Sequence, residues 1–347
     1  MLFDLLVVGA GPAGSAAAIC AAGQGLNVAL IERRPFPRDV PGEALHPDVE
    51  DLFSQLGVSE AVSSAGFLRF PGWIRERSGE RDFVPFTGPS GLRFGYQAWR
   101  QELDSILLER AYHLGATVLQ PAIGGDLLIQ NGRVAGLQVD SERLHCRYLV
   151  DASGGARWLS RRLRLHVGRF SPRLVARYGY FRGDGALGVI PEFREHACGW
   201  TWLARVREDC WQWVELSLAP GIGLPLPAPD CGAADVRLRG ADVTWRLVTG
   251  TAGPGYFLCG DAAATLDPAA SNGVARGVAA GLKAAGLIAR IMNRKIDEPG
   301  AAREYREWLA REFAAQAAEL VLRYRALENP PLWLPAEFKN SFAEPYT

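Results

Sequence analysis

Residues 2–32 read LFDLLVVGAGPAGSAAAICAAGQGLNVALIE, and the order of patterns in this stretch decides the fold of the N-terminal part. The apolar run at 2–8 predicts a buried parallel strand, and the alanine-rich stretch at 15–23 predicts a helix. Residues 27–31 predict a second strand, which Glu32 follows directly. Strand, helix and strand in this order indicate a βαβ unit.

The turn between the first strand and the helix carries the glycine pattern G-x-G-x-x-G. Its first glycine permits a tight turn, its second lets the backbone approach a pyrophosphate, and its third lets the helix pack close to the strand. The helix N-terminus then presents unpaired N–H groups and a positive dipole end to the phosphates. Glu32, 23 positions after Gly9, is expected to accept hydrogen bonds from the adenosine ribose and to disfavour NADP. The expected dinucleotide-binding residues are Gly9, Gly11, Pro12, Ala13, Gly14, Glu32 and Arg33.

The composition excludes several classes of function. The chain has 347 residues, of which 48% are hydrophobic, as in ordinary globular proteins. Its 38 basic residues balance 38 acidic ones, so no net field attracts nucleic acid. The six cysteines form no C-x-x-C pair, and we expect no metal site. The first strand starts at Leu2 and no apolar run approaches the roughly 20 residues that span a bilayer, so we expect a cytoplasmic protein without a transmembrane segment.

Two later patterns extend the nucleotide-binding unit. Residues 96–111 have the apolar spacing of an amphipathic helix, with Arg100 in its first turn. Residues 256–259 predict a strand that runs into Gly260-Asp261, and a small-residue helix is expected from about 272 to 292. A second G-x-G-x-x-G match, at 183–188, lacks a preceding buried strand, and we interpret it as a turn.

This order of motifs resembles the p-hydroxybenzoate-hydroxylase-type superfamily of FAD enzymes. The resemblance implies that FAD is the cofactor, that Arg100 reaches its phosphates, and that Asp261 contacts its ribityl chain or pyrophosphate. It also implies that the helix after the Asp-Pro motif points its N-terminus at the flavin pyrimidine. The cofactor-binding residues added by the resemblance are Arg100, Gly260, Asp261, Pro268, Asn272, Gly273 and Val274.

The fold implied by the resemblance is α/β. It combines a Rossmann-like FAD-binding domain of the three-layer ββα type with an interleaved antiparallel-sheet substrate domain and a C-terminal helix, the helix being indicated by the amphipathic pattern of 301–327. The FAD-binding domain is expected at 1–70, 96–165 and 246–295, the substrate domain at 71–95 and 166–245, and the helical segment at 296–347.

Three stretches indicate a branch of this superfamily. Residues 41–47 (PGEALHP) look like the G-E-x-x-x-P loop of flavin-dependent halogenases and geranylgeranyl-reductase-like proteins, and 199–202 (GWTW) resemble their G-W-x-W strand. Residues 242–274 most closely resemble the flavoproteins required for cysteine tryptophylquinone biogenesis in amino-acid oxidases. Asn272 stands where that family has histidine, so chemistry assigned to that histidine is not carried over.

The resemblance implies an FAD-dependent monooxygenase that hydroxylates a tryptophan side chain, in a protein or peptide partner, through a flavin C4a-(hydro)peroxide. O₂ is then a co-substrate, and NAD(P)H or an external reductase supplies the reduced flavin. The loop places Glu43 and His46 as catalytic candidates, with helix capping as the alternative for Glu43. Trp200 and Trp202 are candidates to stack a substrate, with core packing as the alternative.

Other functions stay open. One alternative is a geranylgeranyl-reductase-like oxidoreductase acting on an apolar small molecule, and another is a non-catalytic FAD-binding maturation factor. Halogenation is disfavoured because the halogenases use a lysine a few tens of residues after the G-E-x-x-x-P loop. This chain has no lysine before Lys283, and Arg69 in the corresponding stretch stays protonated.

Overall fold

The computed structural model describes residues 2–38, 40–89, 91–182, 188–219, 221–224 and 239–335, and the side chains of Glu43 and Ala270 lie outside the described part. The α-helices are α1 (Pro12–Gly23), α2 (Val49–Leu56), α3 (Ser59–Ser64), α4 (Arg100–His113), α5 (Trp158–Arg162), α6 (Gly273–Met292) and α7 (Glu298–Arg325). Short 3₁₀ turns are η1 (Gly154–Ala156), η2 (Gly260–Ala262) and η3 (Pro268–Ala270). The expected α/β fold is confirmed.

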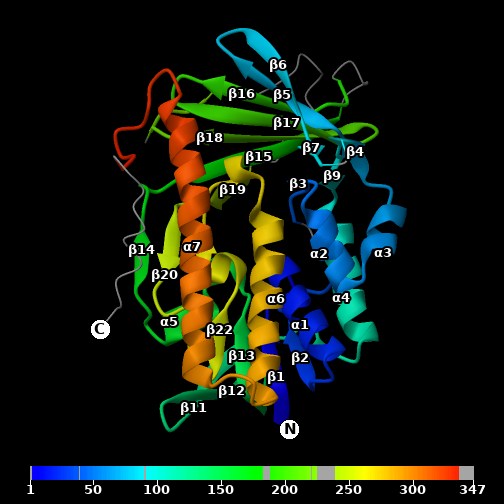
Figure 1. Cartoon of the computed structure of the whole chain (residues 1–347), viewed down its shortest axis with the longest axis vertical. Helices are drawn as coiled ribbons and strands as arrows, with labels where there is room; N and C mark the ends of the chain where they lie inside the picture. Colours follow the sequence, from blue (N-terminus) through cyan, green and yellow to red (C-terminus); the bar gives the residue numbers. More distant parts are fainter. Residues whose placement is uncertain are drawn as a thin grey trace.

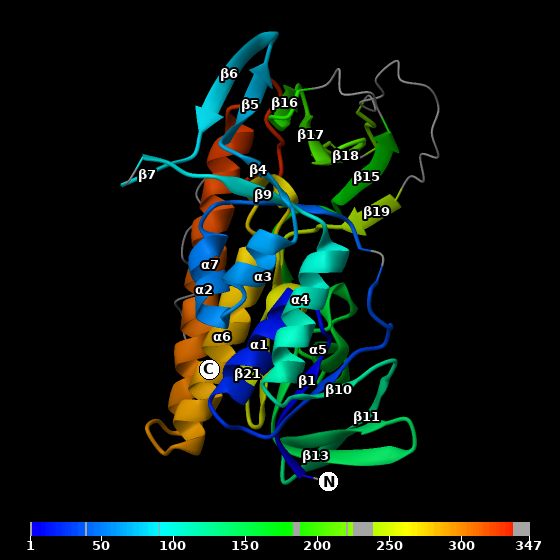
Figure 2. The same cartoon turned by 90° about the vertical axis from the view of Figure 1, so that its right-hand side faces the viewer.

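The lower part of the molecule in Figure 1 is built on a mixed sheet. Its strands are β1 (Leu2–Val8), β2 (Val28–Ile31), β10 (Thr117–Leu119), β11 (Gly124–Gln130), β12 (Arg133–Val139), β13 (Glu142–Asp151), β21 (Ala252–Gly253) and β22 (Tyr256–Leu258). The strands β10, β2, β1, β13 and β22 pair in parallel in that order, and β12 and β11 continue from β13 as antiparallel strands. Figures 1 and 2 show α7, α6, α1 and α4 side by side over one face of this sheet.

A second sheet covers the upper end of the molecule (Figure 1). In sheet order its strands are β19 (Arg239–Asp242), β15 (Val175–Arg182), β18 (Cys210–Ser217), β17 (Gly199–Arg207), β16 (Glu192–His196), β5 (Gly72–Arg77) and β6 (Glu80–Pro85). Its neighbours are antiparallel except β16 and β5, which are parallel.

Three small sheets connect or flank these layers. The first contains β3 (Glu43–Leu45), β9 (Gly95–Ala98) and β4 (Leu68–Phe70) and lies between the upper sheet and the helices (Figure 2). The second contains β14 (Val167–Arg169), β20 (Arg246–Val248) and β23 (Ala264–Thr265), and the third contains β7 (Thr87–Gly88) and β8 (Gly91–Leu92).

The sequence prediction of a helix at 96–111 is wrong at its start. Residues 96–98 belong to β9, where they pair with β3 and β4, and the helix starts only at Arg100. Tertiary pairing of a fully buried strand has overridden the apolar spacing that favoured helix. The helix expected at 301–327 is α7, and most of the second glycine match, residues 183–187, lies outside the described residues.

Helix α7 joins the two layers. Asp297 caps its N-terminus by accepting a hydrogen bond from the Gly300 N–H at 2.9 Å. Further along, the Tyr305 hydroxyl donates to the Leu258 carbonyl at 2.7 Å, and the indole of Trp200 in the upper sheet donates to the Tyr324 hydroxyl at 3.0 Å. In the described part of the chain, none of the helices has the length and apolarity of a membrane span.

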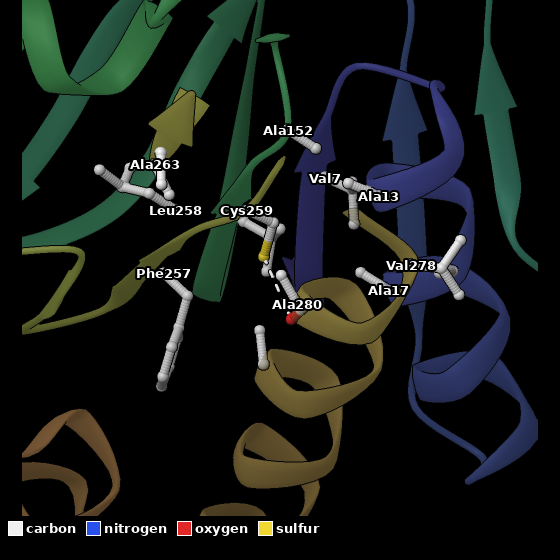
Figure 3. Packing of buried hydrophobic residues seen from close by; sticks show 14 of the residues in the cluster. Val7, Ala13, Ala17, Ala152, Phe257, Leu258, Cys259, Ala263, Val278 and Ala280 are labelled. Carbon is white, nitrogen blue, oxygen red and sulfur yellow. Dashed lines mark hydrogen bonds between the residues drawn. The ribbon is translucent and has the colours of Figure 1, made fainter. Parts of the chain in front are cut away.

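The helices α1 and α6 pack through small residues (Figure 3). Ala13 and Ala17 of α1 are buried against α6, and a Cβ placed on Gly281 of α6 would lie 2.2 Å from the Ala13 carbonyl oxygen. The two backbones therefore approach too closely for a side chain at this position. Glycine at 281 fixes the distance between the two helices.

We predict that Gly281→Ala lowers the free energy of unfolding by about 1–3 kcal/mol, since the added methyl group must push α1 and α6 apart. Gly286→Ala in the same helix is the control, because a Cβ there meets nothing within 4 Å. It should stabilise the protein by about 0.5–1 kcal/mol through helix propensity alone. Denaturant unfolding followed by circular dichroism measures both, and equal effects would contradict the close contact.

Candidate functional site

A cavity of about 400 Å³ opens where β1 and β2 end and where α1 and α6 begin. Segments from both halves of the chain line it. Its lining includes Gly9, Gly11, Pro12, Ala13, Glu32, Arg33, Arg38, Arg100, Ala152, Ser153, Gly154, Trp158, Cys259, Gly260, Asp261, Gly273, Val274 and Gly277. Of the residues predicted to bind the cofactor, the lining lacks Gly14, Pro268 and Asn272. The other predicted residues are brought together as the sequence analysis expected.

Two helix N-termini face this cavity without caps of their own. Gly11, the N-cap of α1, has no side chain, and the side chain of Asn272, the N-cap of α6, does not bond to its helix. The first turn of each helix lacks acidic residues as well. Unpaired N–H groups and the positive ends of two helix dipoles therefore meet at the cavity, which favours a bound anion.

Glycines at the start of the chain are required by close contacts. A Cβ on Gly14 would lie 1.8 Å from the Gly9 carbonyl oxygen, and a Cβ on Gly9, whose φ is +101°, would lie 2.4 Å from the Ala152 carbonyl oxygen. Gly14 thus acts behind the cavity, in packing α1 against the turn. A Cβ on Gly11 would meet only the end of the Arg38 side chain, at 3.3 Å, so this glycine leaves the cavity wall open.

The carboxylate of Glu32 is buried at one end of the cavity. It accepts hydrogen bonds from the Ala10 N–H at 2.9 Å, the Arg34 N–H at 2.9 Å and the Arg38 guanidinium at 3.1 Å. Arg38 also pairs with the buried Asp104 at 2.8 Å, and Asp104 pairs with Arg100 at 2.8 Å. Arg100 is therefore positioned at the cavity by α4, as expected, with its charge balanced by Asp104.

Arg38 and the turn at Ala152–Gly154 line the cavity but were not predicted from the sequence as site residues. Arg38 lies in a loop without hydrophobic periodicity, so only its basic charge near the glycine pattern could have indicated it. The turn follows β13 and is held by Asp151, whose carboxylate accepts from the Ser153 N–H at 3.0 Å and the Leu159 N–H at 2.8 Å. Burial raises the pKa of Asp151. Polar residues directly after a buried parallel strand were the available signal.

Asp261 reaches the cavity from η2, and its side chain is 56% exposed. Its nearest cation is Arg276 in α6, at 3.9 Å, and the guanidinium of Arg276 also donates to the Gln316 side chain in α7 at 3.2 Å. Burial lowers the pKa of Arg276. This buried cation adds positive charge beside the N-terminus of α6, and the sequence analysis did not single it out.

A buried hydrogen-bond network holds the loop before α6. The Asp267 carboxylate accepts from the Trp245 indole at 2.7 Å, the Tyr324 hydroxyl at 2.6 Å and the Ala269 N–H at 3.0 Å. Since Trp200 donates to Tyr324, the network runs from the upper sheet through α7 to the Asp-Pro turn. Burial raises the pKa of Asp267. Pro268 belongs to this turn, is exposed and does not line the cavity.

The catalytic candidates lie apart from the cavity lining. His46 pairs through Nδ1 with Asp48 at 3.0 Å and packs edge-on against Phe86. Glu43 is in β3, opposite Ala98, and its side chain is outside the described part. The segment that carries Glu43 and His46 is held by two hydrogen bonds at Gly42. The Gly42 N–H donates to the Tyr180 hydroxyl at 2.6 Å, and the Gly42 carbonyl accepts from the Gln212 side chain at 3.0 Å. Their catalytic roles stay predictions.

The tryptophans of the upper sheet lie on its two faces. Trp200 and Trp202 are in β17 and Trp211 and Trp213 in β18, as the alternating patterns predicted. Because Leu203 is opposite Trp213, the β18 pair points away from the β17 pair. Trp200 is 2% exposed and donates its indole N–H to the Tyr324 hydroxyl, whereas Trp202 is half-buried on the same face of the sheet. Trp202 therefore has the greater freedom to meet a substrate.

Comparison with known proteins gives the family. Residues 4–161 match the model of a family described as FAD dependent oxidoreductase. A tryptophan 2-halogenase from Chondromyces crocatus is 30% identical over 345 residues, covering 87% of this chain and 64% of the relative. A menaquinone reductase from Mycobacterium tuberculosis is 29% identical, covering 82% of this chain and 76% of the relative. The structure of the myxobacterial chondrochloren halogenase CndH matches with a TM-score of 0.81 and 25% identity, covering 93% of this chain and 82% of that one.

Residues 4–161 therefore match the FAD-dependent oxidoreductases, and the chain as a whole is similar in fold to a flavin-dependent halogenase. It spans 64% of the length of the tryptophan 2-halogenase. The expected relation to flavin-dependent halogenases is confirmed, and so is FAD as the cofactor.

The residues present fit FAD. The uncapped N-terminus of α1 and the open wall at Gly11 suit a pyrophosphate, and the buried Glu32 beside them suits an adenosine ribose. The first residues of α6, Gly273 and Val274, line the same cavity, so both helix N-termini are available to one extended cofactor. When bound, FAD would supply two-electron redox chemistry at this cavity.

We predict that Gly11→Ala weakens FAD binding at least about tenfold, equivalent to about 1.4 kcal/mol, because the methyl group enters the space that the backbone leaves for phosphate. Gly155→Ala is the control, since a Cβ there meets nothing within 4 Å and the residue does not line the cavity. Titration of the flavin-free protein with FAD by fluorescence measures both. A loss of the same size in the control would contradict the assignment of Gly11.

We also predict that Tyr324→Phe lowers the free energy of unfolding by about 1–3 kcal/mol, because the buried Asp267 loses a donor. Burial raises the pKa of Asp267, so its contribution to stability is complete below its unfolded value and declines as the pH rises through the folded value. The Tyr324 hydrogen bond favours the ionised carboxylate, so the loss should be no smaller at neutral pH than below about pH 3.9 and should grow as the pH rises through the folded pKa of Asp267. Tyr112→Phe, at a side chain 64% exposed, is the control and should be neutral in denaturant unfolding at both pH values.

Proposed function

We propose that this oxidoreductase hydroxylates the indole ring of tryptophan, in a protein or peptide partner that matures into a tryptophylquinone. The similarity to a tryptophan 2-halogenase supports an indole as the target. The resemblance of residues 242–274 to tryptophylquinone biogenesis flavoproteins supports a partner-bound tryptophan. The observation that carries oxygen rather than halogen transfer is the absence of any lysine before Lys283.

The side chain at the corresponding stretch supports the same choice. Arg69 donates to the Glu50 carboxylate at 2.7 Å and to the Phe94 carbonyl at 3.1 Å, and its guanidinium lies 3.9 Å above the centre of the Tyr96 ring. These contacts tie β4 to β9 and α2. An arginine held in this way cannot replace a nucleophilic lysine amine.

In this proposal the protein binds and orients rather than reacts. The N-terminus of α6, with Gly273 and Val274, would stabilise negative charge on the flavin. Trp202 would stack the substrate indole, and the loop gripped by Tyr180 and Gln212 would exclude water from the reaction. His46 would exchange a proton with the substrate. O₂ is the co-substrate, and NAD(P)H or an external reductase provides the electrons.

Halogenation is the second candidate, and the halogenase names of the tryptophan-modifying relative and of the similar solved structure favour it. It needs the same aromatic substrate and the same reduced cofactor. The two candidates differ in the group transferred, oxygen or halogen, and the product distinguishes them.

We predict that the FAD-loaded protein, reduced without air and then mixed with isotopically labelled dioxygen and a tryptophan-containing peptide, incorporates one labelled oxygen atom into the indole. Mass spectrometry of the peptide measures the incorporation, with chloride and bromide present in parallel samples. Trp202→Leu should raise KM for the peptide about tenfold with less change in kcat, because stacking is lost. Trp211→Leu, on the opposite face of the sheet, is the control.

Three outcomes would contradict this proposal. Halogen in the indole would establish the second candidate. Reduction of an isoprenoid or quinone with no change to tryptophan would indicate a reductase. Maturation of the partner that depends on bound FAD but proceeds without flavin turnover would indicate a non-catalytic maturation factor.

A further inference from the structure

Residues 157–173 (RWLSRRLRLHVGRFSPR), called the arginine segment below, contain six arginines and no acidic residue, in a chain whose formal net charge is zero. The segment forms α5, β14 and the turn before β15. Figure 1 shows α5, β14 and β20 along one edge of the molecule. The five arginines after Arg157 are exposed. One of them, Arg162, also packs on Trp158, with its guanidinium 4.2 Å from the centre of the ring.

In the part of the chain that the structure describes, these arginines lack the acidic partners that other arginines have, and Arg162 donates instead to the carbonyls of Gly125 at 3.1 Å and Trp158 at 3.2 Å. Among the described residues, arginines elsewhere form many ion pairs, but no carboxylate lies within ion-pair distance of any arginine in this segment. The Nε of Arg157 is buried without a hydrogen-bond partner. Burial and the neighbouring guanidinium groups of Arg246 and Arg161 lower the pKa of Arg157.

The strand pairing concentrates the charge further. In the antiparallel pair of β14 and β20, Arg169 is directly opposite Arg246. Like charges opposite one another destabilise a sheet, and Asp242 forms its ion pair with Arg246, at 2.7 Å, and not with Arg169. The fold therefore keeps an unfavourable cluster of positive charge at this surface, which an acidic ligand would relieve.

We propose that the arginine segment is a docking surface for an acidic protein partner. Six guanidinium groups spread over successive elements exceed what one phosphate or carboxylate group engages, which is one or two bidentate arginines. An extended acidic surface satisfies them, and such charge complementarity steers association between proteins. The inference rests on the proposed function only for the expectation that the partner is a protein.

Other polyanions fit the segment less well. Single-stranded nucleic acid requires exposed aromatic rings for stacking, but Trp158 is half-buried and donates to the Gly124 carbonyl at 2.8 Å, and Phe170 packs on Phe313. A membrane surface requires exposed apolar side chains beside the basic ones, and the large hydrophobic residues exposed in the described part lie outside this segment.

The position of the surface suits a partner that exchanges material with the cofactor site. Ala156 and Trp158, on either side of Arg157, line the cavity. A protein docked on the arginine segment would therefore lie against the cavity wall formed by η1 and α5.

The test measures binding of a fluorescein-labelled peptide of alternating glutamate and glycine to the FAD-loaded protein by fluorescence anisotropy. We expect binding at low ionic strength that weakens as salt is added, and a loss of at least about tenfold in the triple variant R161E/R169E/R173E. None of these three side chains forms a hydrogen bond or ion pair among the described residues. The neutral variant R161Q/R169Q/R173Q should lose less, and both must match the wild type in melting temperature and flavin absorbance.

The control variant R143E/R303E/R311E reverses the same number of exposed arginines at scattered positions and should change binding less than about twofold. The proposal would be overturned if the wild type did not bind the peptide, or if R161E/R169E/R173E and the control R143E/R303E/R311E lost binding equally. Tighter binding of duplex DNA or phosphatidylglycerol vesicles through the same arginines would overturn the class of partner. Because binding is measured without turnover, failure of tryptophan hydroxylation leaves this result unaffected.

Discussion

The helices α1 and α6 touch through backbone, where Gly281 lies against the Ala13 carbonyl, and this contact determines where the rest of the site can be. It brings two uncapped N-termini to one cavity, although the helices begin at Pro12 and Gly273. Two positive dipole ends repel each other unless negative charge lies between them. The same geometry that makes the cavity costly when it is empty makes it selective for an electron-rich, phosphate-bearing cofactor.

A second constraint fixes the edge of that cavity. Asp267 receives its hydrogen bonds from groups that are distant in sequence, Trp245 before it and Tyr324 near the end of α7. A buried carboxylate with uncharged donors is stable only if those donors stay in place. The turn before α6 is therefore held in position by α7 and, through the hydrogen bond of Trp200 to Tyr324, by the upper sheet. The upper sheet and the layer that forms the cavity are linked by side chains as well as by the chain itself.

The parts of the fold that could be predicted from the sequence are those determined by residues close to one another in the chain. Strand, glycine pattern, helix and acid at fixed spacing within residues 2–32 predicted the βαβ unit at the cavity, and the strand that runs into Gly260-Asp261 was predicted as well. Arg38 was missed because sheet order, not spacing, brings its loop to Asp104. Residues 96–98 were assigned to a helix because a strand that is buried on all sides has no alternating pattern. The tryptophan pairs of β17 and β18 lie on opposite faces of the sheet because of the register between the two strands. Composition does not encode this register.

The cavity is lined by segments from both halves of the chain, and the ribosome makes these segments at different times. The glycine turn at residues 9–14 leaves the ribosome early, whereas Gly260, Asp261 and the first turn of α6 follow only after the whole upper sheet has been made. Until then α1 exposes the alanine face that α6 later covers, and no complete wall exists to retain a nucleotide. A nucleotide can therefore be retained only after α6 has been made and has packed on α1, and the N-terminal βαβ unit alone does not form the cavity.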